Sequence, residues 1–202
     1  MSLELLPRSD FETALSQLSE DTLISLAVTD LDHFMEINDT YGHDVGDEVL
    51  RHLEAVLQGS LPQGALLTRL GGDEYAVALP GLPAENALIL LEEIRTHFSE
   101  HTPNAQIPRK VYFSIGIASR PPHAKSVPDL LRAANEALYR AKSEGRGRVA
   151  IYVESKMTLK SNYYSKASLE RLSKLSDALN RTEASLLREA LDDLFVKRGG
   201  AL

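Results

Sequence analysis

The chain of 202 residues contains no cysteine, which excludes disulfides, zinc–thiolate sites, iron–sulfur clusters and a thiol nucleophile. No apolar run approaches the roughly 20 residues that a membrane helix needs. The N-terminus, with Glu4 and Arg8 among short apolar pieces, lacks the basic-then-apolar layout of a signal peptide. The six histidines are scattered without metal-ligand spacing. These absences favour a cytoplasmic protein with no membrane partner.

The composition is that of an ordinary globular protein, with 43% apolar and 25% charged residues. Its length allows one full domain and a small appendage, at about 100–200 residues per domain. Charge is unevenly distributed: residues 1–154 carry 13 Lys or Arg against 23 Asp or Glu, whereas residues 155–202 carry 9 against 6. An acidic body followed by a basic tail predicts two modules, 1–154 and 155–202, with different partners.

Hydrophobic periodicity predicts an α+β fold for the body, with helices packed on a mixed or antiparallel sheet. Helices are expected near residues 10–19, from Val45 to Gly59, through Ala87–Phe98 and from Ser126 to Gly145. Strands are expected over residues 23–29, 66–70, 74–79, 111–118 and 148–153. Gly71 and Gly72 lie between two of these strands and predict a hairpin in which the glycines supply positive φ angles.

Two acidic turns carry the candidate chemistry. Asp30 and Asp32 follow one strand, and Asp73 and Glu74 lie in the glycine turn of the hairpin. Carboxylates gathered from neighbouring strand ends are typical ligands of Mg²⁺, whose coordination substrate phosphates often complete. Taken alone, such a turn more often belongs to an ordinary hairpin than to a metal site.

Four ordered motifs decide between these interpretations: Asp30–Asp47, Arg69–Tyr75, Ser114–Ala118 and Ala137–Arg148. Together they closely resemble the GGDEF family of diguanylate cyclases, over residues 1 to about 153. The resemblance implies a palm-like sheet covered by helices, related in architecture to nucleotide cyclases. It also implies an enzyme that condenses two GTP molecules into cyclic di-GMP with release of pyrophosphate.

The resemblance further implies roles for individual residues. Asp30 and Asp73 would bind Mg²⁺ or Mn²⁺ with the backbone carbonyl of Leu31, and Asp73 and Glu74 would be catalytic, Asp73 as the candidate base for the ribose 3′-hydroxyl. The residues expected to bind GTP are Asn38 and Asp47 at the guanine, Gly71 and Gly72 along the nucleotide, and Phe34, Lys142 and Arg146 at the phosphates.

Four positions depart from the family pattern. Met35 stands where the family usually has a lysine that stabilises charge on the transferring phosphate, which a methionine cannot do. Tyr75 replaces the usual phenylalanine, a change expected to be mild because both rings pack alike. Pro62 and Ala65 stand where the family's product-inhibition motif has Arg and Asp, so feedback through that site is not expected.

The tail resembles the ribbon-helix-helix family of dimeric DNA-binding proteins, most closely over Leu175–Leu191. That resemblance implies a strand at Met157–Tyr164, two helices, a homodimer and duplex DNA as partner. Strand alternation would direct Thr158, Lys160 and Asn162 to the bases. The alternative is a plain helical hairpin that dimerises the chain, because a piece of this size cannot bury its apolar stripes alone.

Three hypotheses therefore follow. The first is a diguanylate cyclase coupled to a dimeric DNA-binding tail. The second is a DNA-binding transcriptional regulator whose weak or inactive GGDEF body senses GTP or cyclic di-GMP. The third keeps the cyclase and makes the tail a dimerisation element only.

Overall fold

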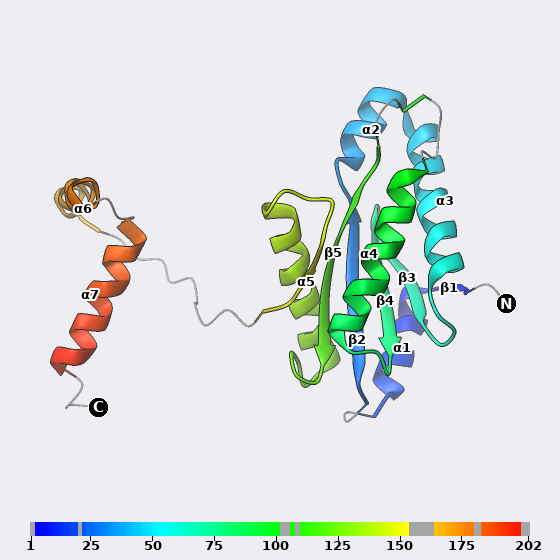
Figure 1. The fold of residues 1–202 in the computed structure, drawn as a ribbon, viewed down its shortest axis with the longest axis horizontal. Helices are drawn as coiled ribbons and strands as arrows, with labels where there is room; N and C mark the ends of the chain where they lie inside the picture. Colours follow the sequence, from blue (N-terminus) through cyan, green and yellow to red (C-terminus); the bar gives the residue numbers. More distant parts are fainter. Residues whose placement is uncertain are drawn as a thin grey trace. The chain divides into compact units, whose positions relative to one another are not determined.

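The computed structural model describes residues 3–19, 22–101, 106–107, 110–153, 164–179 and 183–198. The chain divides into two compact units, residues 1–154 and 155–202 (Figure 1). Among the helices of the described ranges, none is both long enough and apolar enough to cross a membrane.

A six-stranded sheet forms the centre of the first unit, in the order β1-β3-β4-β2-β5-β6 within the described residues. β1 pairs with β3, and β5 with β6, in parallel, whereas β3–β4, β4–β2 and β2–β5 are antiparallel. Every residue of β2 and β5 is buried, so the most apolar runs of the chain lie at the centre. This mixed sheet confirms the predicted α+β class. The strands are β1 (Leu5–Leu6), β2 (Ile24–Leu31), β3 (Leu66–Gly71), β4 (Glu74–Pro80), β5 (Phe113–Arg120) and β6 (Val149–Ile151).

Helices cover both faces of this sheet (Figure 1). Alternate residues of β2 face opposite sides: Leu26 and Val28 pack with α1 and α5, whereas Ala27 and Leu31 pack with α3 and α4. By the same alternation Asp30 belongs to the face that α5 covers. The helices of this unit are α1 (Arg8–Gln17), α2 (Phe34–Tyr41), α3 (His43–Ser60), α4 (Ala84–Glu100) and α5 (Val127–Ser143).

The structure adds two elements that hydrophobic periodicity did not predict, the two-residue strand β1 and the helix α2. Only Ile37 of α2 is buried, so the apolar pattern of that helix is weak. The hairpin turn also differs in detail. Gly72 has a positive φ of 52°, but Gly71 belongs to β3 and does not, so one glycine rather than two supplies the left-handed conformation.

The second unit contains the two predicted helices, α6 (Lys166–Leu179) and α7 (Glu183–Arg198), which contact each other. The expected strand at Met157–Tyr164, with Thr158, Lys160 and Asn162, lies outside the described residues except for Tyr164, which is not in a strand. Leu186 is buried, while other leucines of the hairpin remain largely exposed: Leu169, Leu175, Leu179, Leu191 and Leu194.

Candidate active site

Strand pairing gathers the predicted carboxylates at one end of the sheet. Asp30, near the end of β2, lies opposite Glu74, the first residue of β4, and Asp73 precedes Glu74 in the hairpin turn. From the helix on the same face, Lys142 of α5 places its Nζ 2.6 Å from Oδ1 of Asp30. Carboxylates from two distant parts of the sequence thus lie at one end of the sheet, with a cationic side chain beside Asp30.

The electrostatics of this group favour a bound cation. Burial, followed by the negative charge of Asp30, raises the pKa of the Asp73 carboxyl, although its own backbone amide and Lys142 oppose the rise. A divalent cation beside Asp30 and Asp73 would relieve that repulsion. The described part of the chain holds no cluster of three or more acidic or histidine side chains arranged for a metal. Asp30 and Asp73 therefore suit a hard ion such as Mg²⁺ or Mn²⁺ only with further oxygen ligands, from the Leu31 carbonyl and substrate phosphates.

Asp32 has a different role from Asp30. Its carboxylate accepts hydrogen bonds from the Ser114 hydroxyl, at 2.8 and 3.0 Å, and from the Gly147 amide, at 2.8 Å. Gly147 follows Arg146, which has a left-handed backbone with φ 61°. The buried Asp32 carboxylate thus holds the loop that carries Arg146. The sequence did not reveal this role, because the bonding partners lie 82 and 115 residues further along the chain.

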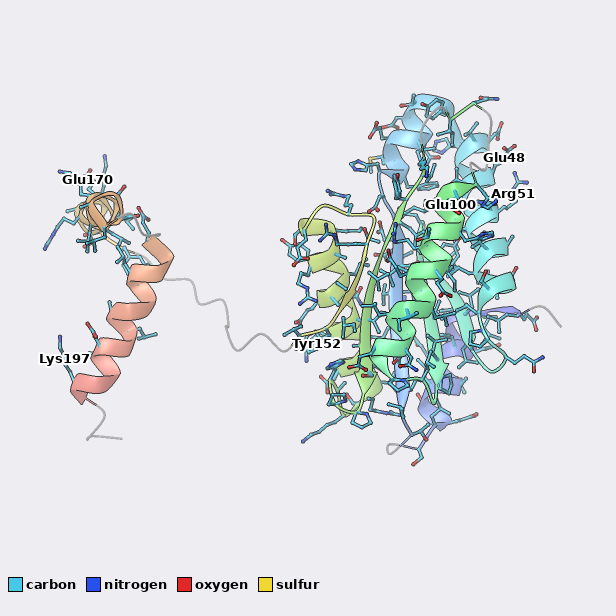
Figure 2. All side chains as sticks on the ribbon, in the orientation of Figure 1. Glu48, Arg51, Glu100, Tyr152, Glu170 and Lys197 are labelled. Carbon is cyan, nitrogen blue, oxygen red and sulfur yellow. The ribbon has the colours of Figure 1, made fainter. Side chains whose placement is uncertain are left out.

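The two residues expected at the guanine lie on adjacent helices. Asn38 of α2 is half-buried, and Asp47 of α3 is exposed next to Gly46. A Cβ atom at Gly46 would lie 1.9 Å from Asn38 Oδ1 and 3.4 Å from Phe34 Cε2. Gly46 therefore makes room for two predicted nucleotide-binding side chains, a role that the sequence reading missed. Arg51, labelled in Figure 2, donates from Nε to the backbone oxygen of Asp47 at 3.3 Å.

The remaining predicted phosphate-binding residues occupy the starts and ends of helices. Phe34 begins α2, and Arg146 is exposed in the turn after α5. Met35, in the first turn of α2, has 76% of its surface exposed, so its side chain packs against little of the protein. A pocket of about 310 Å³ opens at the start of α2 and is lined by Asp32, His33, Ile37, Lys110, Val111 and Tyr112. Lys110 is a cationic residue at this pocket that the sequence reading did not consider.

The turn between β3 and β4 is held from within the hairpin. Arg69 donates from both Nε and Nη2 to the backbone oxygen of Gly72, at 2.8 and 2.6 Å. Because Gly72 precedes Asp73, this contact fixes the peptide group that leads into the candidate catalytic acid. Arg69 belongs to the motif Arg69–Tyr75, but the family resemblance implies no role for it.

Known proteins share this arrangement of sheet and motifs. The chain matches the family model described as "Diguanylate cyclase, GGDEF domain" over residues 6–148. It is 36% identical over 142 residues to the probable diguanylate cyclase DgcT of Escherichia coli K12, covering 69% of this chain and 31% of DgcT. A diguanylate cyclase of Vibrio cholerae is 36% identical over 132 residues, which are 65% of this chain and 41% of that protein. The chain thus spans less than half the length of these curated relatives.

Among solved structures, the GGDEF domain of DgcB from Caulobacter crescentus, in complex with cyclic di-GMP, aligns with a TM-score of 0.67 and 33% identity. That alignment covers 74% of this chain and 92% of the DgcB domain.

Proposed function

Since the chain belongs to the GGDEF family of diguanylate cyclases, we propose that its first unit condenses two GTP molecules into cyclic di-GMP and two pyrophosphates. The observation that carries the proposal is the convergence of Asp30, Asp73 and Glu74 at one end of the sheet, with Lys142 beside Asp30. A nucleotidyl transfer needs carboxylates that bind a metal ion and accept a proton, and a cationic group that binds phosphate.

The reaction consists of two equivalent transfers. In each, the 3′-oxygen of one GTP forms a bond to the α-phosphorus of the other, the bond to pyrophosphate breaks, and the 3′-proton is lost. A divalent cation held by Asp30, Asp73 and the Leu31 carbonyl would neutralise phosphate charge. Asp73 is the candidate acceptor of the 3′-proton, and Glu74 follows it in the chain.

The other predicted residues would bind one GTP per chain. Asp47 can accept hydrogen bonds from guanine N1 and N2, and Asn38 can both donate and accept. Gly71 and Gly72 would lie along the nucleotide, while Phe34, Lys142 and Arg146 would lie at the phosphates, where charge-assisted contacts are strong.

One such site holds one nucleotide, so the product requires two copies of the chain. The second unit supports a homodimer, because its hairpin leaves an apolar groove of about 610 Å³ that includes Leu169, Leu172, Leu175 and Leu187. A second copy of the hairpin would cover these leucines and hold two cyclase units near each other.

The basic balance of residues 155–202 and their likeness to ribbon-helix-helix proteins support duplex DNA as a further partner, with Thr158, Lys160 and Asn162 at the bases. Binding measured at several salt concentrations tests this proposal. Replacing Lys160 and Asn162 by Ala is expected to weaken it, whereas the same change at the exposed Lys125 of the first unit is not. Equal binding by all three proteins would leave the tail as a dimerisation element.

The cyclase proposal is tested by incubating the purified chain with GTP and Mg²⁺ or Mn²⁺ and following cyclic di-GMP and pyrophosphate by chromatography. Asp73→Ala is expected to abolish product, and Asp10→Ala, at an exposed acid on α1, is expected to retain it. A chain that binds GTP but forms no product would favour the second hypothesis, a nucleotide sensor in a DNA-binding regulator, which the exposed Met35 already favours.

A further inference from the structure

A side chain of α3 reaches the hairpin through two contacts. Tyr75 of β4 donates its hydroxyl to Oε1 of Glu54 at 2.8 Å, and Nη1 of Arg69 lies 3.6 Å from the same oxygen. The Arg69 guanidinium carbon also lies 5.7 Å from the centre of the Tyr75 ring. Since Arg69 in turn binds the Gly72 carbonyl, a continuous path of contacts runs from α3 to the turn.

Each member of this path is constrained by its surroundings. Tyr75 is fully buried, and Arg69 lies directly opposite it in the β3–β4 register. The side chain of Glu54 is 23% exposed and that of Arg69 is 38% exposed. A hydroxyl buried to this degree needs a partner, and Glu54 supplies it. The expectation that tyrosine at this position differs only mildly from phenylalanine therefore misses a contact that only the hydroxyl makes.

The position of Glu54 on α3 connects the hairpin turn to the predicted guanine-binding residue on the same helix. Glu54 lies seven residues after Asp47, which is two helical turns and therefore the same face of the helix. One rigid helix thus carries both the residue predicted to bind guanine and the residue that anchors the turn of Asp73. If Asp47 binds guanine as predicted, a fixed distance between α3 and the hairpin would set the spacing between the base and the Asp73 turn.

We propose that Glu54 and Tyr75 are positioning residues that act through Arg69 to hold the Gly72–Asp73 turn in the geometry that nucleotidyl transfer requires. The proposal rests on the cyclase function proposed above. Neither residue touches the reacting atoms; their contribution is to keep the turn from adopting other conformations when metal and nucleotide are absent.

The test compares the full chain with Glu54→Gln, Tyr75→Phe and the pair combined. Glu136→Gln serves as control, because it alters another Glu–Arg contact, to Arg132 on the exposed face of α5. We measure kcat and KM for GTP and, in protein without metal or nucleotide, amide hydrogen exchange across residues 70–75. Each single variant is expected to lower kcat roughly three- to tenfold, the effect of losing one hydrogen bond in Tyr75→Phe or of weakening it by removing the charge in Glu54→Gln, with KM changed less than twofold. Exchange in the turn should become faster while the central strands stay protected.

The double variant is expected to lose little more than Glu54→Gln alone, since both residues act through one path. A variant with unchanged kcat and unchanged turn exchange overturns the proposal. So does an increase in exchange that extends through β2 and β5, because that shows a general loss of stability. If the parent chain makes no product, the cyclase function fails, and turn exchange, with Mn²⁺ affinity measured by electron paramagnetic resonance, still decides whether Glu54 and Tyr75 position the turn.

Discussion

Replacing Gly46 by alanine is expected to weaken GTP binding without unfolding the protein. The new Cβ would lie 1.9 Å from Oδ1 and 3.0 Å from Cγ of Asn38, so the two cannot coexist in the present geometry. Asn38 can respond by rotating, because the atoms in the way belong to the end of its side chain. The carboxamide then leaves the position from which it is predicted to meet guanine.

The magnitudes separate the effect on binding from the effect on folding. Alanine stabilises a helix interior by roughly 0.5–1 kcal/mol relative to glycine, which offsets the cost of moving Asn38. Loss of two hydrogen bonds to guanine costs about 2 kcal/mol, which corresponds to a roughly 30-fold rise in KM. The free energy of unfolding is therefore expected to change little while KM rises.

Gly59 provides the matched control on the same helix. A Cβ at Gly59 has nothing within 4 Å, so Gly59→Ala is expected to leave KM unchanged and to raise the thermal midpoint by a few degrees at most. The assay pairs steady-state kinetics on GTP and ITP with thermal unfolding of both variants. The reasoning is refuted if Gly46→Ala keeps the parent KM, or if its midpoint falls by many degrees, since the helix rather than Asn38 would then have moved.

Three further outcomes are expected. Gly116→Ala should destabilise the fold by about 3 kcal/mol or more in urea titration, because its Cβ would lie 2.0 Å from the Leu138 amide nitrogen and 2.2 Å from the Ala134 carbonyl oxygen, and backbone cannot rotate away. Burial lowers the pKa of His52, so below about pH 6.5 the unfolded chain binds more protons than the folded chain does. The thermal midpoint should therefore decrease as the pH is lowered from 7.5 to 5.5, and it should decrease less in His52→Phe. Met35→Lys should raise kcat roughly 10²- to 10³-fold if the missing cation limits the transfer, and an unchanged kcat would show that it does not.

The fold was predictable where burial leaves a clear mark on the sequence. The strand around Val28 is a short aliphatic run, as a strand buried on both faces requires, and the helix through Leu53 has the apolar period of 3.6 that its one buried face requires; the structure confirms both. The helix α2 was not predictable in this way, because it buries only Ile37 against the core. Instead it packs against α3, with the Asn38 side chain in the space that Gly46 leaves open.

The candidate site was predictable as a set of residues but not as a set of contacts. Asp30 and Asp32 are two apart at the end of one strand, and nothing in their residue type or spacing distinguishes them; only the family resemblance assigns the metal to Asp30. Their contacts distinguish them: Lys142 forms an ion pair with Asp30, whereas Ser114 and Gly147 donate hydrogen bonds to Asp32. Local sequence reports the residue types, but only the folded chain shows which polar groups satisfy each other across the sheet.

The Lys142–Asp30 contact couples metal binding, predicted for Asp30, to phosphate binding, predicted for Lys142. Lys142 Nζ lies 2.6 Å from Oδ1 of Asp30, a carboxylate that would also hold the divalent cation. The ammonium group and the divalent cation would compete for this carboxylate, because their mutual repulsion rises as they approach. A cation held by Asp30 would therefore weaken the Lys142–Asp30 contact and favour a contact between the ammonium group and phosphate. Because Met35 supplies no cation, phosphate binding would depend more strongly on a free Lys142 ammonium group. We expect nucleotide affinity to fall when divalent metal is withheld, and to fall less in Lys142→Met, where no ammonium group has to be released.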